Sequence, residues 1–517
     1  MADKEDARGW PDVGDMPEDE FRSALHRVAD WIADYRARIE ELSISPTVAP
    51  GDITAHLQPA PPEEAAPLDE ILRDFENLIV PGLVHWGHPS FLGYFGSTTT
   101  APGILGEMLA AALNVSAMTW RTSPAATELE SLVLDWIRRM LELPAEFTGV
   151  VYDTASVAVL HALAAAREGL ALEVRERGLC GRRDVPPLRL YASDQAHSSV
   201  EKAAIMLGVG ERNVRRVASD AAYRMDSAHL RHAILEDLRE GLLPLAVIAT
   251  VGTTSTASVD NVEEIAALCR EHRLWLHVDA AYGGAMALLP EGRHLMNGVA
   301  AADSVVVNPH KWLFVPLDFS ALYVRRPELL RATFSLVPEY LRGDAEQAER
   351  NYMDYGVQLG RRFRALKAWM VFRAFGRRGL AARVREHVRL ARLFASWMES
   401  DPRFELLAPV TMGVVCFRNL RRESDGGEPP SDEELNERNR RLVEAVNATG
   451  LTYLTHTILH GRVAMRLAVG NVLTTERHLA QVYDLIKREG DNADHTTTSP
   501  GRGGISVAHD VSRGDKQ

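Results

Sequence analysis

Residues 274–312 read LWLHVDAAYGGAMALLPEGRHLMNGVAAADSVVVNPHKW and contain two apolar stretches that end in polar residues. LWLHVD ends at Asp279, and SVVVN is followed closely by Lys311. Short apolar stretches without polar alternation are typical of strands buried on both faces of a parallel sheet. In such sheets ligands bind at the carboxyl ends of the strands. The stretch therefore predicts an α/β fold with Asp279 and Lys311 at one site.

The flanking sequence continues this alternation of short apolar strands and helices. GVVY (149–152), LRLYAS (188–193) and LAVIATVG (245–252) are further expected strands, with helical segments between them. Strands and helices in alternation favour a mostly parallel sheet with helices on its faces. We therefore expect a large α/β domain over residues 101–375.

Three other regions have different patterns. Apolar residues recur at helical spacing over 21–42, and a Pro-rich connector follows, so residues 1–100 are expected to form a helical arm and its continuation. A long helix and alternating strands predict a smaller α+β domain over 376–490. Residues 491–517 are polar and poor in bulky apolar side chains, which predicts a disordered tail.

Composition excludes several classes of protein. The chain has 517 residues, 46% hydrophobic and 25% charged, and its net charge of −13 disfavours a nucleic-acid partner. We see no apolar run that could span a bilayer, and the acidic start does not resemble a signal peptide, so we expect a cytoplasmic location. Three scattered cysteines suggest neither disulfides nor a thiolate metal site. His85 and His88 lack a third ligand, so no metal is expected.

The other expected strands also end in polar residues. Thr154, Ala155 and Ser156 follow GVVY where a helix begins, and the free N–H groups of a first helical turn can bind a phosphate. An ordinary helix N-cap is the alternative. His197 follows LRLYAS, and Thr254 follows LAVIATVG. A hydrogen-bonded structural histidine and simple turn chemistry are the alternatives for these two residues.

Together these strand ends meet the needs of one cofactor, pyridoxal 5'-phosphate (PLP). PLP requires an anion site for its phosphate, a lysine for its aldehyde, a carboxylate beside its ring nitrogen and a group that covers its ring. A buried lysine with a lowered pKa is a suitable nucleophile. The alternative for Asp279 and Lys311 is an ion pair that only joins two strands.

Six motifs resemble successive blocks of the aromatic-L-amino-acid decarboxylase family, the group II, fold-type-I PLP-dependent decarboxylases. They are SDQAHSSVEKA (193–203), VGTTSTASVDNVEEIA (251–266), WLHVDAAYGG (275–284), RHLMNG (293–298), ADSVVVNPHKW (302–312) and LGRRFRALKAW (359–369). The resemblance runs from about residue 21 to 490. It implies a fold-type-I PLP-dependent transferase-like domain, a homodimer with its active site at the interface, and decarboxylation of an L-amino acid.

The resemblance also implies roles for individual residues. It assigns the cofactor to Lys311, Asp279, His197, Thr154, Ala155, Ser156, Thr254, Asn308 and His310. Lys311 would bind the PLP aldehyde covalently, Asp279 would pair with the ring nitrogen, and His197 would stack on the ring. Tyr340, in VPEYLRGD (337–344), matches a loop tyrosine that returns a proton to the substrate Cα. Lys311, Asp279, His197 and Tyr340 are therefore the expected catalytic residues.

The segment HWGHPSFLGYFGS (85–97) resembles the part of the family that lines the substrate pocket. The expected substrate residues are Trp86, Tyr94, Phe95, Ser97, Met118 and Gly360. Gly360 matches the small residue of relatives that take bulky aromatic substrates, which favours tryptophan, tyrosine, phenylalanine or DOPA. The sequence departs from animal members at Asp153, where glycine is common, at Val157, where glutamate is common, and at Met118, where an aromatic residue reaches across the dimer.

Two alternatives remain open for the reaction. One is an aldehyde synthase on the same scaffold, which in relatives accompanies loss of the loop tyrosine or the stacking histidine; Tyr340 and His197 are both present here. The other is decarboxylation of a non-aromatic amino acid.

Overall fold

A computed structural model describes residues 14–96, 99–336, 350–420 and 430–495, with side chains through residue 492. Its centre is a seven-stranded sheet in the order β1-β7-β6-β5-β4-β2-β3. The strands are β1 (Thr148–Tyr152), β2 (Leu188–Ser193), β3 (Val214–Val217), β4 (Leu243–Thr250), β5 (Trp275–Asp279), β6 (Ser304–Val307) and β7 (Ser320–Val324). β2 to β6 pair in parallel, whereas β7 runs antiparallel to β1 and β6. The prediction of a mostly parallel sheet is confirmed.

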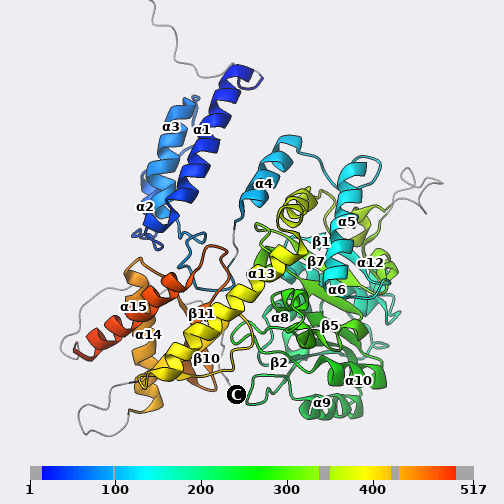
Figure 1. Ribbon diagram of the computed structural model, residues 1–517. Helices are drawn as coiled ribbons and strands as arrows, with labels where there is room; N and C mark the ends of the chain where they lie inside the picture. Colours follow the sequence, from blue (N-terminus) through cyan, green and yellow to red (C-terminus); the bar gives the residue numbers. More distant parts are fainter. Residues whose placement is uncertain (1–13, 97–98, 337–349, 421–429, 496–517) are drawn as a thin grey trace, which may run out of the picture.

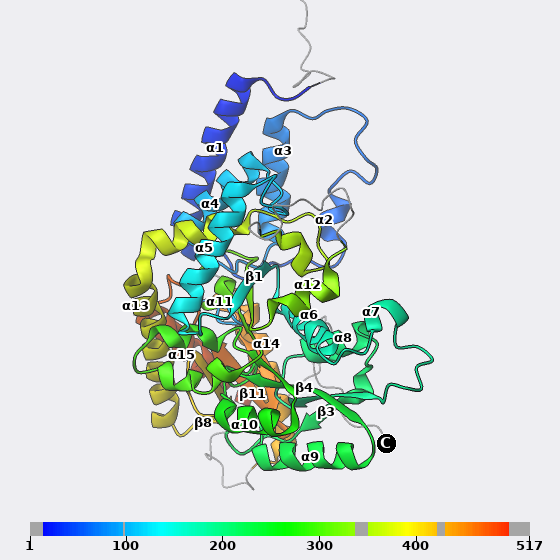
Figure 2. The same ribbon diagram turned by 90° about the vertical axis from the view of Figure 1, so that its right-hand side faces the viewer.

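The sheet is buried because helices cover it, as the continuous apolar strands predicted. Every residue of β5 and β6 is buried. The covering helices are α5 (Pro124–Met140), α6 (Ala155–Glu168), α8 (Ser199–Met206), α9 (Ser227–Arg239), α10 (Val262–His272) and α12 (Pro327–Phe334), with the short α7 (Val174–Arg177) beside them (Figures 1 and 2). α6 packs against five strands, β1 and β4 to β7, and this packing fixes the start of the helix at the sheet edge.

A second, four-stranded antiparallel sheet has the order β10-β11-β9-β8. Its strands are β8 (Phe404–Leu406), β9 (Val414–Asn419), β10 (Thr455–Leu459) and β11 (Arg462–Ala468), and α14 (Asp432–Ala448) and α15 (Glu476–His495) accompany them. α13 (Arg364–Ser400), yellow in Figure 1, contributes to the hydrophobic clusters of both parts of the chain and is interrupted at Gly376, where φ is 61°. The small sheet shares a separate hydrophobic cluster with α13, α14 and α15. The smaller α+β part is therefore present, and its division at residue 376 stays a prediction.

The predicted tail, residues 491–517, overlaps the end of α15, and its boundary stays a prediction. α15 continues to His495, and Asp491 lies 3.6 Å from the guanidinium of Arg403. A polar side chain on an exposed last turn does not end a helix when it has an ionic partner, which is why composition alone placed the boundary at residue 491. The rest of the predicted tail, residues 496–517, lies outside the described residues.

The N-terminal segment begins with α1 (Glu18–Ala37), followed by α2 (Asp52–Ala55) and α3 (Leu68–Asp74). α1 and α3 lie side by side and extend away from both sheets in the two views (Figures 1 and 2). Trp31 stacks on Tyr35 at 5.2 Å between ring centroids and meets Phe75 edge-on at 5.0 Å. No helix within the described ranges is both long and apolar enough to cross a membrane.

Several large apolar side chains remain exposed on this segment and on α4 (Ala101–Leu113). We call them the N-terminal apolar surface, which comprises Phe21, Leu25, Ile71, Leu105, Leu109 and Leu113. The three leucines of α4 recur every four residues and therefore share one helix face. A stripe of this kind normally lies against another surface.

Candidate functional site

Asp279 and Lys311 lie at the carboxyl edge of the large sheet. Asp279 is the last residue of β5, is 8% exposed, and accepts a hydrogen bond from the Ala281 N–H at 3.0 Å. Lys311 lies in the short helix α11 (Pro309–Trp312), which follows the neighbouring parallel strand β6. Burial lowers the pKa of the Lys311 amine, while the charge of Asp279 opposes that shift. The geometry thus produces a desolvated lysine within the field of a carboxylate.

Three stacked aromatic rings lie beside Lys311. Its Nζ lies 4.8 Å from the centroid of the Phe95 ring. Phe95 stacks on Tyr282 at 4.0 Å, and Tyr282 stacks on Trp312 at 4.4 Å. Phe95, a predicted substrate residue, therefore comes from the N-terminal segment to contact the predicted cofactor lysine.

Arg466 is a residue of this site that the sequence did not reveal. It lies on β11 of the small sheet, is 4% exposed, and its Cζ lies 4.7 Å from the same Phe95 centroid. Its Nη1 donates to the Tyr94 carbonyl at 2.7 Å, and its Nε to the Thr254 carbonyl at 3.1 Å. Nη2 is buried and has no hydrogen-bond partner in the described part of the chain. The available signal was a charged residue between apolar neighbours in the interior of a strand.

His197 follows β2 and lies within the electrostatic influence of Asp279 and Lys311. Its Nδ1 accepts a hydrogen bond from the Ser199 N–H at 3.1 Å, and the side chain remains exposed. The surrounding protein lowers the pKa of the imidazole chiefly by desolvation, whereas Asp279 raises it and Lys311 lowers it further. The structure thus brings His197, Asp279 and Lys311 within electrostatic reach of one another. Thr254 is exposed, and its carbonyl is tied to the guanidinium described above.

The start of α6 has no side-chain cap. Thr154 precedes the helix in an extended conformation, and its hydroxyl makes no cap hydrogen bond. Instead the Thr154 N–H and hydroxyl donate to Asp153 Oδ1 at 2.6 and 3.3 Å. The simple N-cap alternative is therefore not what the structure shows. The first-turn N–H groups at Ala155 and Ser156 suit an anion, although the neighbouring Asp153 carboxylate is itself negative.

Asn308 and His310 flank the lysine and are both buried. Asn308 Oδ1 accepts a hydrogen bond from the Ser320 hydroxyl at 2.6 Å. His310 Nδ1 accepts one from the Phe319 N–H at 3.0 Å, and burial, aided by the charge of Lys311, lowers its pKa to about 3. A neutral His310 thus attaches the lysine-bearing helix to Phe319, the residue that immediately precedes strand β7.

The predicted substrate residues fall into two groups. Trp86 and Tyr94 are half exposed and stack on each other at 5.4 Å, next to Phe95 in the chain. Met118 and Gly360 lie on two other segments, which are joined by a hydrogen bond from the Ala117 N–H to the Arg361 carbonyl. A Cβ added at Gly360 would meet no atom within 4 Å. Ser97 and the predicted proton donor Tyr340 lie outside the described residues.

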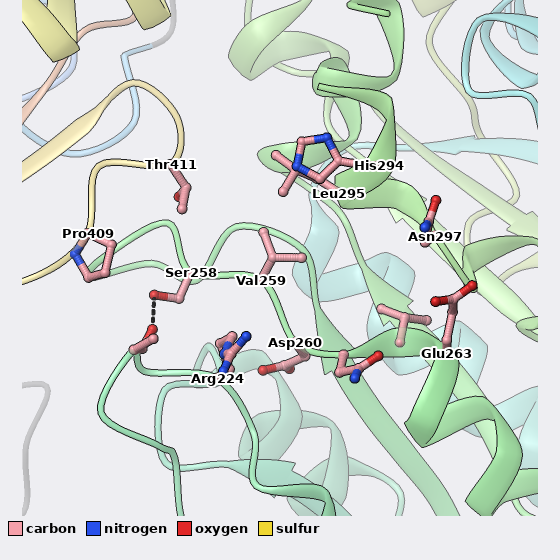
Figure 3. A pocket seen from close by; sticks show the side chains of 13 residues that line it. Arg224, Ser258, Val259, Asp260, Glu263, His294, Leu295, Asn297, Pro409 and Thr411 are labelled. Atoms are coloured by element: carbon pink, nitrogen blue, oxygen red, sulfur yellow. Dashed lines mark hydrogen bonds between the residues drawn. The ribbon is translucent and has the colours of Figure 1, made fainter. Parts of the chain in front are cut away.

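A cavity of about 340 Å³ lies apart from these residues (Figure 3). Its walls include Arg224, Asp260, His294 and Thr411, and none of the predicted site residues lines it. Burial raises the pKa of Asp260 to about 6, and its two carboxylate oxygens accept the Met225 and Thr250 N–H groups at 2.7 Å. Asp260 is therefore occupied by structural hydrogen bonds.

Nothing in the described ranges forms a cluster of three or more His, Cys, Asp or Glu side chains that could hold a metal ion. His85 Nδ1 lies 2.9 Å from the Tyr35 hydroxyl, and His88 Nδ1 accepts the Ser90 N–H at 3.0 Å. These two histidines have protein partners.

The arrangement fits PLP. A desolvated amine, a buried carboxylate and an imidazole converge at the ends of β6, β5 and β2, and the uncapped start of α6 supplies N–H donors for a phosphate. Phe95 and Trp86 offer apolar surface for a substrate side chain.

Comparisons with known proteins agree with this fit. The model of the pyridoxal-dependent decarboxylase conserved domain matches residues 50–420. Tryptophan decarboxylase 1 of Oryza sativa subsp. japonica is 39% identical over 485 residues, covering 91% of this chain and 93% of that protein. Phenylacetaldehyde synthase of a Rosa hybrid cultivar is 38% identical over 484 residues, with 91% and 93% coverage. A crystal structure of Oryza sativa TDC with PLP and tryptamine superposes with a TM-score of 0.88 at 38% identity, covering 93% of this chain and 99% of that one.

Proposed function

Since the chain belongs to the pyridoxal-dependent decarboxylase family, and is thus a PLP-dependent amino-acid decarboxylase, we propose that it converts an aromatic L-amino acid to the corresponding amine and carbon dioxide. The observation that carries the proposal is the desolvated Lys311 amine, which lies 4.8 Å from the centroid of the Phe95 ring and within the electrostatic influence of the Asp279 carboxylate.

We assign roles to the residues at this edge as follows. Lys311 attaches the cofactor, because its desolvated amine is a nucleophile toward an aldehyde. Asp279 keeps a proton on the cofactor ring nitrogen, and His197 covers one ring face. The N–H groups of Ala155 and Ser156 hold the phosphate at the start of α6. Once bound, PLP supplies the electron sink into which the bond to the substrate carboxylate breaks.

The other residues assigned to the cofactor position the lysine and the cofactor ring. Asn308 and His310 fix the helix that carries the lysine, through Ser320 and the Phe319 N–H. Thr254 would lie beside the ring, and its carbonyl accepts a hydrogen bond from Arg466. Tyr340 returns a proton to the substrate Cα after carbon dioxide leaves, a role that rests on the sequence motif alone.

Two observations support an aromatic substrate. The Phe95 ring lies beside the lysine, and Tyr94, the residue before it, stacks on Trp86; the aromatic ring of a substrate stacks favourably on such side chains. One relative that matches nearly the whole chain is a tryptophan decarboxylase, and a related structure contains tryptamine. Gly360 adds open space, because no atom lies near its missing Cβ.

An aldehyde synthase is the second candidate, because a phenylacetaldehyde synthase is nearly as similar to the chain as the tryptophan decarboxylase is. His197 and Tyr340 are both present, and this favours the amine as the product. Incubation with each of the twenty amino acids, DOPA and 5-hydroxytryptophan, with carbon dioxide, amine and aldehyde measured together, separates the candidates. Aldehyde in excess over amine, or a preference for glutamate, would contradict the proposal.

The attachment of the cofactor is tested with Lys311→Ala. Wild-type protein reconstituted with PLP should show a cofactor absorbance that borohydride fixes to the polypeptide, and peptide mapping should find the label on Lys311. The variant should acquire no label. A label of equal yield in Lys311→Ala protein would refute the assignment.

We also propose that the chain works as a cytoplasmic homodimer whose active site lies at the interface. The N-terminal apolar surface supports this proposal, because the leucine stripe of α4 and the exposed residues of α1 and α3 need a covering partner. Sedimentation of the purified chain tests it, and a stable monomer with full activity would contradict it.

A further inference from the structure

A buried ion pair lies next to the segments that carry two of the predicted pocket residues, Met118 and Gly360. Arg361 is 5% exposed and Glu130, on α5, is 2% exposed. Arg361 Nη2 donates to Glu130 Oε1 at 2.6 Å, and Nη1 donates to Oε2 at 3.0 Å. The contact is therefore the bidentate arrangement that a guanidinium forms with a carboxylate.

The remaining hydrogen bonds of the pair go to the main chain of two other segments. Arg361 Nη1 donates to the Ala117 carbonyl at 2.9 Å, and Nη2 donates to the Val151 carbonyl at 2.9 Å. Glu130 Oε1 accepts the Val151 N–H at 3.2 Å. One ion pair thus ties α5, strand β1 and the segment around residue 117 together.

The segment around residue 117 contains Met118, and the residue before Arg361 is Gly360. The Ala117 N–H donates to the Arg361 carbonyl at 2.7 Å, and the Met353 N–H donates to the Met118 carbonyl at 3.1 Å. Gly360 is therefore the covalent neighbour of Arg361, and Met118 is the covalent neighbour of Ala117, which is hydrogen-bonded to Arg361.

The ion pair also connects the segments that carry Met118 and Gly360, which we call the pocket wall, to the start of α6. Val151, which uses both its N–H and its carbonyl on the pair, lies two residues before Asp153. Gln358, two residues before Gly360, donates a hydrogen bond from Nε2 to Asp153 Oδ2 at 3.4 Å. A change in the length or direction of the Arg361–Glu130 contact would thus move the wall relative to the turn proposed to hold the cofactor phosphate.

Stability alone does not account for such a pair. Replacing a buried ion pair by apolar residues of similar volume is often neutral or stabilising, because desolvation opposes the attraction. What the planar guanidinium adds is a fixed direction for several donors at once, which lysine does not provide. Tyr352, whose ring centroid lies 4.8 Å from the Arg361 Cζ and whose hydroxyl lies 2.9 Å from Ser131 Oγ, restricts the guanidinium further.

We propose that Arg361 and Glu130 are positioning residues that set the placement of Met118 and Gly360 and so determine which aromatic side chains the enzyme accepts. This inference rests on the proposed function, since it concerns the specificity of the same site. A one-methylene change in a pocket alters discrimination between substrates by roughly 10- to 200-fold. A displaced wall should therefore alter the ratio of kcat/KM between a large and a small aromatic substrate.

The test measures that ratio by competition, with L-tryptophan and L-phenylalanine in one reaction and both amines quantified. Arg361→Lys should change the ratio by about fivefold or more. The matched control is Arg362→Lys, because Arg362 is the next residue, has a side chain that is 55% exposed, and forms an ion pair with Glu107. Its ratio should stay within about twofold of wild type. A merely structural loss lowers the amount of active enzyme and cancels from the ratio.

Glu130→Asp provides the second variant, because it keeps the ion pair and shortens the carboxylate arm. It should also move the ratio, with PLP content per chain close to that of wild type. An unchanged ratio in both Arg361→Lys and Glu130→Asp would overturn the inference while wild-type decarboxylation of aromatic amino acids still stood. A wild-type protein that decarboxylates no aromatic amino acid would overturn the proposed function instead.

Discussion

Removing the charge of Arg466 should make Lys311 harder to deprotonate. Burial lowers the pKa of Lys311, Asp279 raises it, and the nearby guanidinium of Arg466 lowers it. The Lys311 Nζ and the Arg466 Cζ lie 4.8 and 4.7 Å from the centroid of the Phe95 ring, so the two cations are at most 9.5 Å apart. At an effective dielectric constant of about 20 their repulsion is at least about 1.7 kcal/mol, which is more than tenfold in the equilibrium between ammonium and amine.

The assay is the rate at which apoenzyme captures PLP, followed by the cofactor absorbance over a range of pH. The amine of Lys311 is the reacting form, so the rate rises with pH until the lysine is deprotonated. In Arg466→Gln protein the midpoint should move to higher pH, because a neighbouring positive charge no longer favours the neutral lysine. On the acidic limb, where the amine is the minor form, the rate should fall about tenfold.

Arg466→Lys is the matched control. It keeps the positive charge, and it loses the same guanidinium hydrogen bonds to the Tyr94 and Thr254 carbonyls. Its midpoint should therefore stay close to that of wild type even if its maximal rate is lower. Equal midpoints in wild type and Arg466→Gln, or an equal shift in both variants, would refute the electrostatic reasoning, since the second result would mean that lost geometry alone produces the effect.

Three further predictions concern the proposed roles. Asp279→Asn should lower kcat roughly 100-fold while PLP still attaches to Lys311, because the lost carboxylate acts on the cofactor ring nitrogen; stopped-flow and steady-state rates check this, and wild-type kcat would remove Asp279 from its role. Tyr340→Phe should reduce amine output and increase aldehyde and ammonia, measured by chromatography; an unchanged product ratio would exclude Tyr340 as the proton donor. Leu109→Glu places a charge on the N-terminal apolar surface and should shift the chain to monomers and reduce activity in sedimentation and rate measurements, whereas an unchanged sedimentation coefficient would show that α4 is not at an interface.

The large sheet and its site edge were predictable because their signals are local. The apolar runs that end at Asp279 and precede Lys311 specify buried parallel strands, and parallel strands bring their carboxyl ends to one edge. The antiparallel insertion of β7 between β1 and β6 was not predictable, because pairing direction depends on long-range connections and not on residue pattern. The boundary predicted at residue 491 overlaps the last turn of α15, where Asp491 lies 3.6 Å from Arg403, a contact between distant segments that composition does not reveal.

Arg361 was visible in the sequence only as one member of an arginine pair, and its neighbour in that pair is exposed. The hydrogen bonds of Arg361 go to α5 and β1, far from it in the chain, so no local pattern distinguishes the buried arginine from the exposed one. Burial of a charge is decided by whether distant partners happen to meet it. The burial of Arg466 could not be predicted for the same reason, because its partners Tyr94 and Thr254 are far from it in the chain.

The positions of these arginines explain how the site depends on the whole fold. Lys311 comes from the large sheet, Phe95 from the N-terminal segment and Arg466 from the small sheet, and the two cations share the face or edge of a single ring. Arg466 also holds the carbonyl of Tyr94, a residue with a positive φ of 53°, which a non-glycine residue adopts only when its surroundings fix it. A displacement of the small sheet would therefore release the aromatic segment and change the field at the lysine in one step. The chemistry proposed for the large sheet thus requires that all three regions be packed together, although the sequence motifs for that chemistry lie almost entirely in one of them.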